Sequence, residues 1–341
     1  MTSPLLRVDG LSVVYRIRDR VLHGLDDITL AVNENEILGI VGESGCGKTT
    51  LSMSIMRLLP PNAEVTAGRV TFKDRDLTGL SREEMRQLRG SEISMVFQDP
   101  LTSLNPTFSI GQQMRFLQRG HLRESRSVQV DRAAAALQRV GIPDARRRLG
   151  AYPHEFSGGM RQRVMIAMAV LLEPALVIAD EPTSALDVTL QAEILELLDD
   201  LRRSRGTSIL FVSHDLGVIS QICDRVVVMY AGRVVETGSV QSLFACPLHP
   251  YTRALLGAVP SRRHRGRPLE SIPGRVPSLS ELPIGCKFAD RCGYVDAVCL
   301  PREPDLLQPT TGGDVVRCYA YDPSVSRSAS FTELVDASLV C

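Results

Sequence analysis

The stretch Gly42-Glu-Ser-Gly-Cys-Gly-Lys-Thr49 decides how the rest of the chain is interpreted. It fits the pattern G-x-x-x-x-G-K-[ST], and it lies between an apolar run at 36–41, which predicts a strand, and a helical stretch at 48–59. Glycines in such a loop let backbone N–H groups turn toward phosphate oxygens, and the helix start adds partial positive charge. Lys48 would reach the β- and γ-phosphates, and Thr49 would bind Mg²⁺. The alternative is a glycine-rich turn that binds nothing, but the strand and helix around the motif favour a phosphate loop.

A second motif supplies the acidic groups that a phosphate loop needs. Leu176-Val-Ile-Ala-Asp-Glu181 predicts a buried strand that ends in two adjacent carboxylates. Side chains on a strand alternate in direction, so the two acids can do different work. Asp180 can hold Mg²⁺, and Glu181 can polarise the water that attacks the γ-phosphate.

The order of the other elements predicts an α/β fold. The expected strands lie at 5–15, 28–32, 36–41, 70–72, 93–97, 176–179, 208–212, 226–229 and 233–236, and the expected helices at 48–59, 190–203 and over most of 105–149. Such alternation implies a largely parallel sheet covered by helices. We expect a main domain at 1–258 with a helical subdomain inserted at about 100–170. The composition then becomes rich in proline, arginine and cysteine, with little periodicity, which predicts a small extension at 259–341.

Composition limits the classes of function. The 39 basic residues balance 39 acidic ones, which argues against a chain built to grip nucleic acid, and the cluster Arg262, Arg263, Arg265 and Arg267 is interpreted as a solvated linker. There is no apolar run of about 18 residues and no secretory signal, so any membrane role is expected to come through partners. Only three of the basic residues are lysines: Lys48, Lys73 and Lys287. An ammonium is a compact point charge, whereas a guanidinium is a planar fork, and compactness matters at Lys48 because this residue lies inside the glycine-rich loop.

The order of further motifs resembles that of ATP-binding-cassette (ABC) ATPases. Phe156-Ser-Gly-Gly-Met-Arg-Gln162 resembles the family's signature motif and opens a helical run before the acidic strand. The family also has a glutamine after a strand, matched by Gln98, a motif after the acidic pair, matched by Ser184-Ala-Leu-Asp187, and a switch histidine, matched by His214. One departure is Met160, where the general family pattern has glutamine.

The resemblance implies a role for each matched residue. Glu181, His214 and Gln98 would be catalytic, and Thr49, Gln98 and Asp180 would hold Mg²⁺. Ser157, Gly158 and Gly159 would bind the γ-phosphate of ATP held by a second cassette, so that two cassettes enclose the nucleotide. For Tyr15, stacking on adenine and a plain strand-edge tyrosine are weighted equally. The residues expected to contact nucleotide are Tyr15, Gly42, Ser44, Gly45, Cys46, Gly47, Lys48, Thr49, Thr50, Ser157, Gly158, Gly159 and Asp187.

Three stretches resemble the ATPases of bacterial dipeptide and oligopeptide importers in particular: 97–106, 152–163 and 247–252. This implies an ATPase at the cytoplasmic face of the plasma membrane, with a second, different cassette, two transmembrane permease subunits and an extracytoplasmic substrate-binding protein. Importers for nickel and for glutathione share these stretches, so the cargo stays open. Two other classes of function compete with a transporter ATPase. A soluble cassette ATPase of DNA repair usually carries a long coiled coil, and one of translation usually has two cassettes in one chain; neither feature is found in this sequence. A metal-binding sensor that no longer hydrolyses ATP should have lost its acidic or switch residues, yet Glu181 and His214 are present.

Four cysteines of the extension are candidate metal ligands. In a reducing cytoplasm, Cys286, Cys292, Cys299 and Cys318 suggest metal ligation before disulfides, and Cys341 is expected to be uninvolved. The intervening spacings of five, six and eighteen residues contain no Cys-x-x-Cys pair, so zinc and plain thiols remain alternatives. The resemblance to iron–sulfur subunits among the peptide importers favours a [4Fe–4S] cluster.

Overall fold

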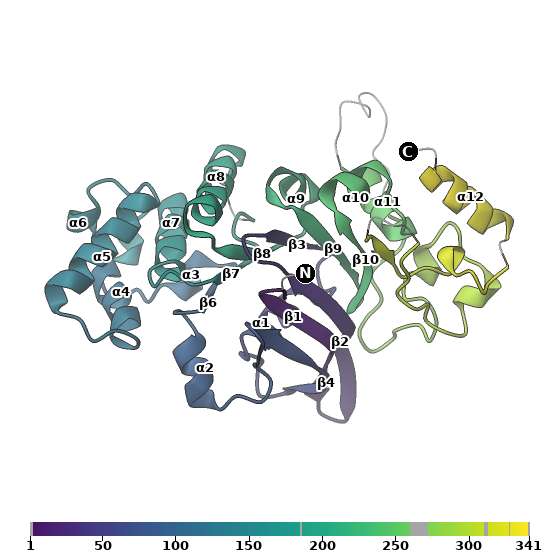
Figure 1. Cartoon of the computed structure of the whole chain (residues 1–341), viewed down its shortest axis with the longest axis horizontal. Helices are drawn as coiled ribbons and strands as arrows, with labels where there is room; N and C mark the ends of the chain where they lie inside the picture. Colours follow the sequence, from purple (N-terminus) through teal and green to yellow (C-terminus); the bar gives the residue numbers. More distant parts are fainter. Residues whose placement is uncertain (1–2, 185, 260–271, 310–312, 327, 340–341) are drawn as a thin grey trace. The chain divides into compact units, whose positions relative to one another are not determined.

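The computed structural model describes residues 3–184, 186–259, 272–309, 313–326 and 328–339 (Figure 1). The linker expected at Arg262, Arg263, Arg265 and Arg267 lies outside these residues, as do Ala185 and Cys341. The chain divides into two compact units. The first holds 1–5, 32–37 and 73–212, and the second holds 6–31, 38–72 and 213–341.

Three parallel strands form the sheet of the first unit: β6 (Ile93–Val96), β7 (Leu176–Asp180) and β8 (Ser208–Ser213). Strand β7 lies between the other two, with Ala179 opposite Val96 and Asp180 opposite Val212. Every residue of the three strands is buried, as parallel strands are when both faces of the sheet are covered. The predicted acidic pair therefore begins at the carboxyl end of a buried strand.

Helices make up most of the rest of the first unit. They are α2 (Arg82–Leu88), α3 (Pro100–Ser103), α4 (Ile110–Arg119), α5 (Arg126–Arg139), α6 (Ala145–Arg148), α7 (Gly158–Ala169) and α8 (Val188–Arg205), with a short strand β5 (Arg75–Asp76) and a 3-10 turn at Pro153–Glu155. Helix α5 contacts α4, α6 and α7, which gather in one group (Figure 1). Ser109, Ser125 and Ser157 cap α4, α5 and α7, because each hydroxyl accepts a backbone N–H of the first turn. The helical character expected over 105–149 is confirmed.

An antiparallel sheet begins the second unit, with β1 (Leu6–Ile17) between β2 (Arg20–Val32) and β4 (Ala63–Phe72). Leu6 lies opposite Phe72, and Tyr15 lies opposite Ala63. The expectation of one largely parallel sheet is wrong for these strands. Strand β2 also begins eight residues before the expected 28–32, because its first half is a mostly exposed strand without the apolar alternation that marks a buried one.

The remaining strands of the second unit carry the nucleotide loop and the extension. Strand β3 (Ile37–Val41) runs parallel to β9 (Arg225–Tyr230), β10 (Arg233–Ser239) is antiparallel to β9, and β11 (Val315–Val316) is antiparallel to β10. The helices are α1 (Lys48–Ile55), α9 (Leu216–Ile222), α10 (Val240–Ala245), α11 (Pro250–Gly257) and α12 (Ala329–Leu339), with 3-10 turns at Ala289–Arg291, Ala297–Cys299 and Tyr319–Tyr321. Phe331 and Leu334 of α12 pack with Tyr319 and Cys299 in a buried cluster. The extension thus has its own apolar core and shares a unit with the loop that follows β3.

Helix α1 ends earlier than expected, at Ile55 instead of Leu59. Arg57 has a φ of 50°, a left-handed conformation that stops the helix. Leu59 precedes Pro60, which disfavours the helical conformation of the residue before it. Among the described residues, none of the helices combines the length and the apolar character needed to cross a bilayer.

Candidate nucleotide site

The predicted phosphate loop joins β3 to α1 in the second unit, in the strand-loop-helix context that the motif requires. At two positions of the loop, steric crowding excludes any residue with a side chain. A Cβ on Gly42 would lie 2.2 Å from the backbone oxygen of Met229, and one on Gly47, whose φ is 105°, would lie 2.9 Å from the oxygen of Gly24. Neither backbone oxygen can move like the end of a flexible side chain, so glycine is needed at both positions.

Lys48 is buried inside this loop, with a relative exposure of 5%. Its Nζ donates to the backbone oxygen of Gly42 at 2.7 Å and to that of Glu43 at 3.2 Å. Ser44, Gly45 and Thr49 are exposed, whereas Cys46 is buried, and burial raises the pKa of its thiol. The Lys48 ammonium therefore lies inside the loop, whereas the hydroxyl-bearing residues Ser44 and Thr49 face solvent.

Tyr15 lies next to the helix that the loop opens. Its hydroxyl is 2.9 Å from Oγ1 of Thr50, and a Cβ on Gly24 would lie 2.6 Å from its ring, which is too close. The side chain is partly exposed. Both readings of Tyr15, adenine stacking and strand-edge tyrosine, fit this position.

The catalytic candidates of the first unit meet at the end of β7. Asp180 is 2% exposed at the last position of that strand, and Glu181 follows with a φ of 48°. A left-handed conformation is uncommon for a residue with a side chain, and it turns the chain sharply after the strand. The Nε2 of Gln98 donates to Oε2 of Glu181 at 3.0 Å. The structure therefore places the predicted glutamine against the predicted base, although 83 positions separate them.

The signature motif opens helix α7. Ser157 is exposed at the N-cap, and its hydroxyl accepts the backbone N–H of Met160 at 3.3 Å. A Cβ on Gly158 would meet nothing within 4 Å, whereas one on Gly159 would lie 2.9 Å from Leu190 of α8. Met160 contributes its backbone to the cap, so the departure from glutamine at this position leaves the cap intact. An exposed serine and glycine at a helix start suit an anion.

Two further candidates lie at the starts of helices. Asp187 accepts the backbone N–H of Leu190 at 3.0 Å and so caps α8. His214 is exposed directly after β8, and the next residue, Asp215, caps α9 by accepting the N–H of Gly217 at 2.7 Å. The candidates are thus divided between the units: Tyr15, the phosphate loop and His214 belong to the second, and the others to the first.

The four cysteines of the extension line one apolar cavity in the second unit. Cys286, Cys292, Cys299 and Cys318 share this cavity with His249, Phe288, Tyr294, Phe331 and other residues. Burial raises the pKa of all four thiols, to about 11 for Cys292 and to about 12 for Cys318. In the part of the chain that the structure describes, no three His, Cys, Asp or Glu side chains are arranged so that they could hold a metal ion. The cysteines are therefore gathered, but they do not surround a single-ion centre.

Two contacts of the phosphate loop were not predicted from the sequence, although one of the two residues, Tyr251, lies in the stretch 247–252 noted above. Tyr251 and Arg291 both bond Glu43, from 208 and 248 positions further along the chain. Glu43 stands at a variable position of the motif, and nothing in the sequence links it to two residues so far away. Its place inside the loop is the only signal that could have drawn attention to it.

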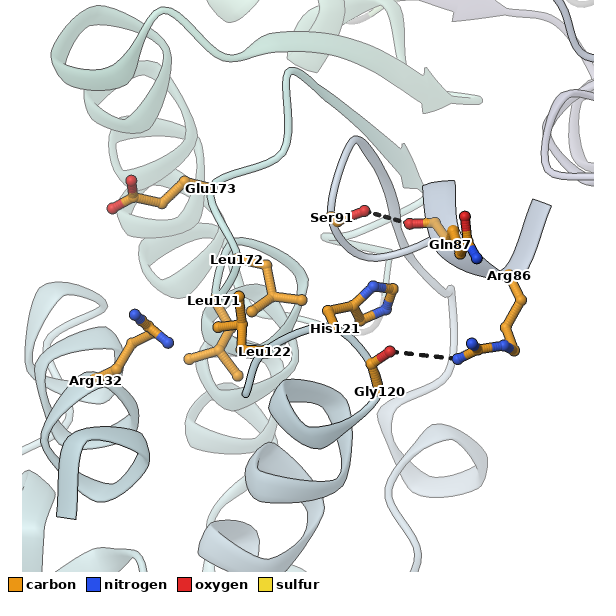
Figure 2. Close-up of a pocket in the computed structure, with 10 residues that line it drawn as sticks. All are labelled: Arg86, Gln87, Ser91, Gly120, His121, Leu122, Arg132, Leu171, Leu172 and Glu173. Carbon is orange, nitrogen blue, oxygen red and sulfur yellow. Dashed lines mark hydrogen bonds between the residues drawn. The ribbon is translucent and has the colours of Figure 1, made fainter. Parts of the chain in front are cut away.

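A pocket of about 500 Å³ lies in the first unit, away from the end of β7. Figure 2 shows Arg86 donating to the backbone oxygen of Gly120, at 3.3 Å, with His121 beside it. Burial, and then the charge of Arg86, lower the pKa of His121. His121 and Leu172 also line a neighbouring apolar groove, which includes Phe97, Leu117 and Met168. The groove therefore reaches the residue directly before Gln98.

Comparisons with known proteins agree with these features. Residues 25–184 match the family described as ABC transporter, and residues 235–299 match the C-terminal region of oligopeptide/dipeptide transporters. A probable peptide ABC transporter ATP-binding protein of Sinorhizobium fredii is 50% identical over 320 residues, which cover 92% of this chain and 94% of the relative. A putative peptide import ATP-binding protein of Brucella melitensis is 48% identical over 316 residues, 89% of this chain and 94% of the relative.

Solved structures show the same fold. One is an ATP-binding cassette captured as a dimer in a post-hydrolysis state with ADP and Pi; it has 26% identity and a TM-score of 0.63, and the match covers 69% of this chain and 98% of the other. Another is cbiO1 of Clostridium perfringens, part of the ABC transporter complex cbiONQ, with 31% identity, a TM-score of 0.62, and coverage of 72% and 92%. The chain is therefore an ATP-binding, ATP-hydrolysing member of the ABC transporter family, in the group that carries the oligopeptide/dipeptide transporter C-terminal region.

Proposed function

We propose that this chain powers the import of di- and oligopeptides through a membrane complex. The observation that carries the proposal is the similarity to proteins named as peptide transporter ATPases, which extends over about nine tenths of the chain and includes its C-terminal region. The complex would contain two transmembrane permease subunits, a second cassette and an extracytoplasmic binding protein, with this chain at the cytoplasmic face of the membrane.

The test is to purify the chain with its membrane partners and to measure ATP hydrolysis in the reconstituted complex. Stimulation by peptides with their binding protein supports the proposal. Stimulation by nickel or glutathione alone assigns the complex to a different cargo. Copurification with ribosomes or nucleic acid, and with no membrane protein, contradicts a transport function.

In the proposed cycle, Lys48 and the loop amides hold the triphosphate, and stacking on the adenine is one of the two roles that the position of Tyr15 fits. Thr49, Asp180 and Gln98 would hold Mg²⁺, which neutralises charge on the transferred phosphoryl group. Glu181 orients the attacking water, and His214 contacts the γ-phosphate. Ser157, Gly158 and Gly159 bind the γ-phosphate of the nucleotide held by the second cassette, and Asp187 is a further nucleotide contact. The support is the exposure of the α7 start and the pairing of Glu181 with Gln98 at 3.0 Å.

We propose the apolar groove lined by Phe97, Leu117 and Met168 as the docking surface for a permease subunit. The support is that Phe97 and Leu117, which are 36% and 37% exposed, line this groove together with Met168. Phe97 directly precedes Gln98, which bonds Glu181. A permease segment that contacts Phe97 would thus be separated from the proposed base by Gln98 alone, which gives a physical route between permease and ATP.

Replacing Leu117 with aspartate is expected to weaken assembly with the permease by about 2 kcal/mol or more, because a charge would be buried in an apolar interface. Copurification with tagged permease subunits measures this, and nucleotide binding by the purified chain should be unchanged. Val128→Asp is a matched control, since Val128 is 45% exposed in the same unit and does not line the groove. Equal assembly of the Leu117 variant and the wild type would remove the groove as the docking surface.

We also propose that the four cavity cysteines hold a [4Fe–4S] cluster. The support is their common cavity and the soft donor set, because four thiolates are the ligands of such clusters. A cluster occupies more space than one ion, so its thiolates stand further apart than those of a single-ion centre. The cluster would add a structural centre to a small extension.

Chain purified anaerobically is expected to contain about four irons and four sulfides, because each corner of the cluster is one iron or one sulfide. Cys292→Ser should lower the bound iron, whereas Cys246→Ser should not, since Cys246 is not among the residues of the cavity. Iron and sulfide analysis with visible absorbance measures both. A colourless, iron-free wild-type protein would refute the cluster, and one zinc per chain would replace it with a different centre.

For the domain boundaries we propose 1–258 for the ATPase domain, with the helical subdomain at about 100–170, and 259–341 for the extension. The match of 235–299 to the transporter C-terminal region supports a distinct segment that begins near the end of the ATPase domain.

A further inference from the structure

Glu43, the second residue of the phosphate loop, is held by two groups from distant parts of the sequence. Its backbone N–H donates to the hydroxyl of Tyr251 at 2.9 Å. Its carboxylate accepts two bonds from Arg291, Nη1 to Oε2 at 2.7 Å and Nη2 to Oε1 at 3.1 Å. A paired fork of this kind fixes the orientation of the carboxylate as well as its position. Both ends of Glu43 are therefore fixed by residues outside the motif.

Arg291 is itself firmly placed. Its side chain is 5% exposed, and its Nε donates to the backbone oxygen of Pro273 at 2.7 Å. Its Nη1 also reaches the hydroxyl of Tyr230 at 3.3 Å, and the guanidinium carbon is 5.7 Å from the centre of that ring and 5.9 Å from that of Phe288. A guanidinium held by four groups loses little further freedom when it binds a carboxylate. The extension thus presents a preorganised cation to the loop.

The charge of Glu43 makes this contact important for an anion site. The loop has to bind a triphosphate, and an uncompensated carboxylate inside it would repel that ligand. The Glu43 side chain is only 29% exposed, so water screens its charge incompletely. Arg291 compensates the charge, and Lys48 donates to the backbone oxygen of the same Glu43 residue at 3.2 Å. Glu43 therefore contributes to the shape of the loop through its backbone bonds and to the charge of the loop through its carboxylate.

We propose that Arg291 is a positioning residue for the phosphate loop and that the C-terminal extension, through it, sets the affinity for ATP. The extension is then a working part of the nucleotide site. Arg291 also directly precedes Cys292, which lines the cysteine cavity.

The test is the affinity of the full chain for a fluorescent ATP analogue. Arg291→Ala is expected to weaken binding about tenfold or more, within the range of coupling between linked sites. Arg291→Lys should restore part of the loss, because an ammonium keeps the charge but cannot form the paired fork. In steady-state hydrolysis, Arg291→Ala should raise the KM for ATP and leave kcat at saturating ATP largely unchanged.

Arg317 offers a matched control. Its side chain is also 5% exposed, and it also directly precedes a cavity cysteine, Cys318. It donates to the backbone oxygens of Val234 and Pro304 at 3.0 and 3.1 Å and to Asp27 at 3.3 Å, and none of these three bonds reaches the loop. Arg317→Ala is therefore expected to keep the nucleotide affinity within about twofold of wild type, even if it lowers the melting temperature.

A double-mutant cycle separates the pair from general damage. In a Glu43→Gln background, Arg291→Ala should cost much less affinity than in the wild type, because the charge that Arg291 compensates is gone. Circular dichroism and melting curves establish that each variant is folded. Wild-type affinity in folded Arg291→Ala would overturn the proposal, as would an equal loss in Arg317→Ala or a cycle that shows no coupling with Glu43.

Discussion

Replacing Glu181 with glutamine is expected to lower the rate of ATP hydrolysis by about 10²- to 10⁴-fold, the usual contribution of a positioned general base. Glu181 follows buried Asp180 at the end of β7, in a left-handed conformation, and it accepts a bond from Gln98 at 3.0 Å. Glutamine has the same shape but cannot take a proton from water. Release of phosphate from the reconstituted complex measures the rate, and fluorescent ATP titration should give an affinity within about twofold of wild type.

Glu92→Gln is the control for this substitution. Glu92 lies in the same unit, one residue before β6, and pairs with Lys73 at the surface at 2.6 Å. Exposed pairs contribute little, so turnover should stay within about twofold of wild type. Normal turnover in Glu181→Gln would remove the catalytic assignment, and loss of ATP binding in that variant would show that Glu181 holds the nucleotide instead.

Local patterns predicted most of the fold. The buried strands at 93–97, 176–179, 208–212 and 226–229 agree with β6, β7, β8 and β9 to within two residues at each end. Apolar runs bounded by turns define these strands, because a parallel strand that is buried on both faces reads as a continuous apolar run. The exposed first half of β2 and the early end of α1 were missed, because strand pairing and the left-handed Arg57 are not encoded in periodicity.

The candidate site likewise has features that the sequence predicts and contacts that it does not. Phosphate loop, acidic strand and signature could be predicted because each motif is local, and its chemistry follows from residue type and neighbours. The contacts of Glu43 could not, since Tyr251 and Arg291 lie 208 and 248 positions further along the chain and only the folded structure brings them to it. The cysteines are an intermediate case: their spacing predicts no ligand pattern, yet folding brings four of them to one cavity.

Lys48→Ala is expected to weaken ATP binding about tenfold to a hundredfold, the loss that follows removal of a charged hydrogen-bond donor. Lys48 is 5% exposed, and its Nζ lies within bonding distance of two loop oxygens, at 2.7 and 3.2 Å. Removing the ammonium takes away the positive charge at the centre of the loop and leaves the oxygens of Gly42 and Glu43 without this donor. Titration with a fluorescent ATP analogue measures the loss.

The scarcity of lysine makes the comparison with arginine informative. Arginine holds 36 of the 39 basic positions, so this chain accepts a guanidinium almost everywhere that a cation is useful. Lys48→Arg should nevertheless bind ATP poorly, because a planar fork does not fit between loop oxygens that a compact ammonium can bridge. Lys73→Arg, at an exposed pair with Glu92, is the matched control and should bind as the wild type does. Tight binding by Lys48→Arg would show that the loop needs only a positive charge, and the steric argument for its single lysine would fail.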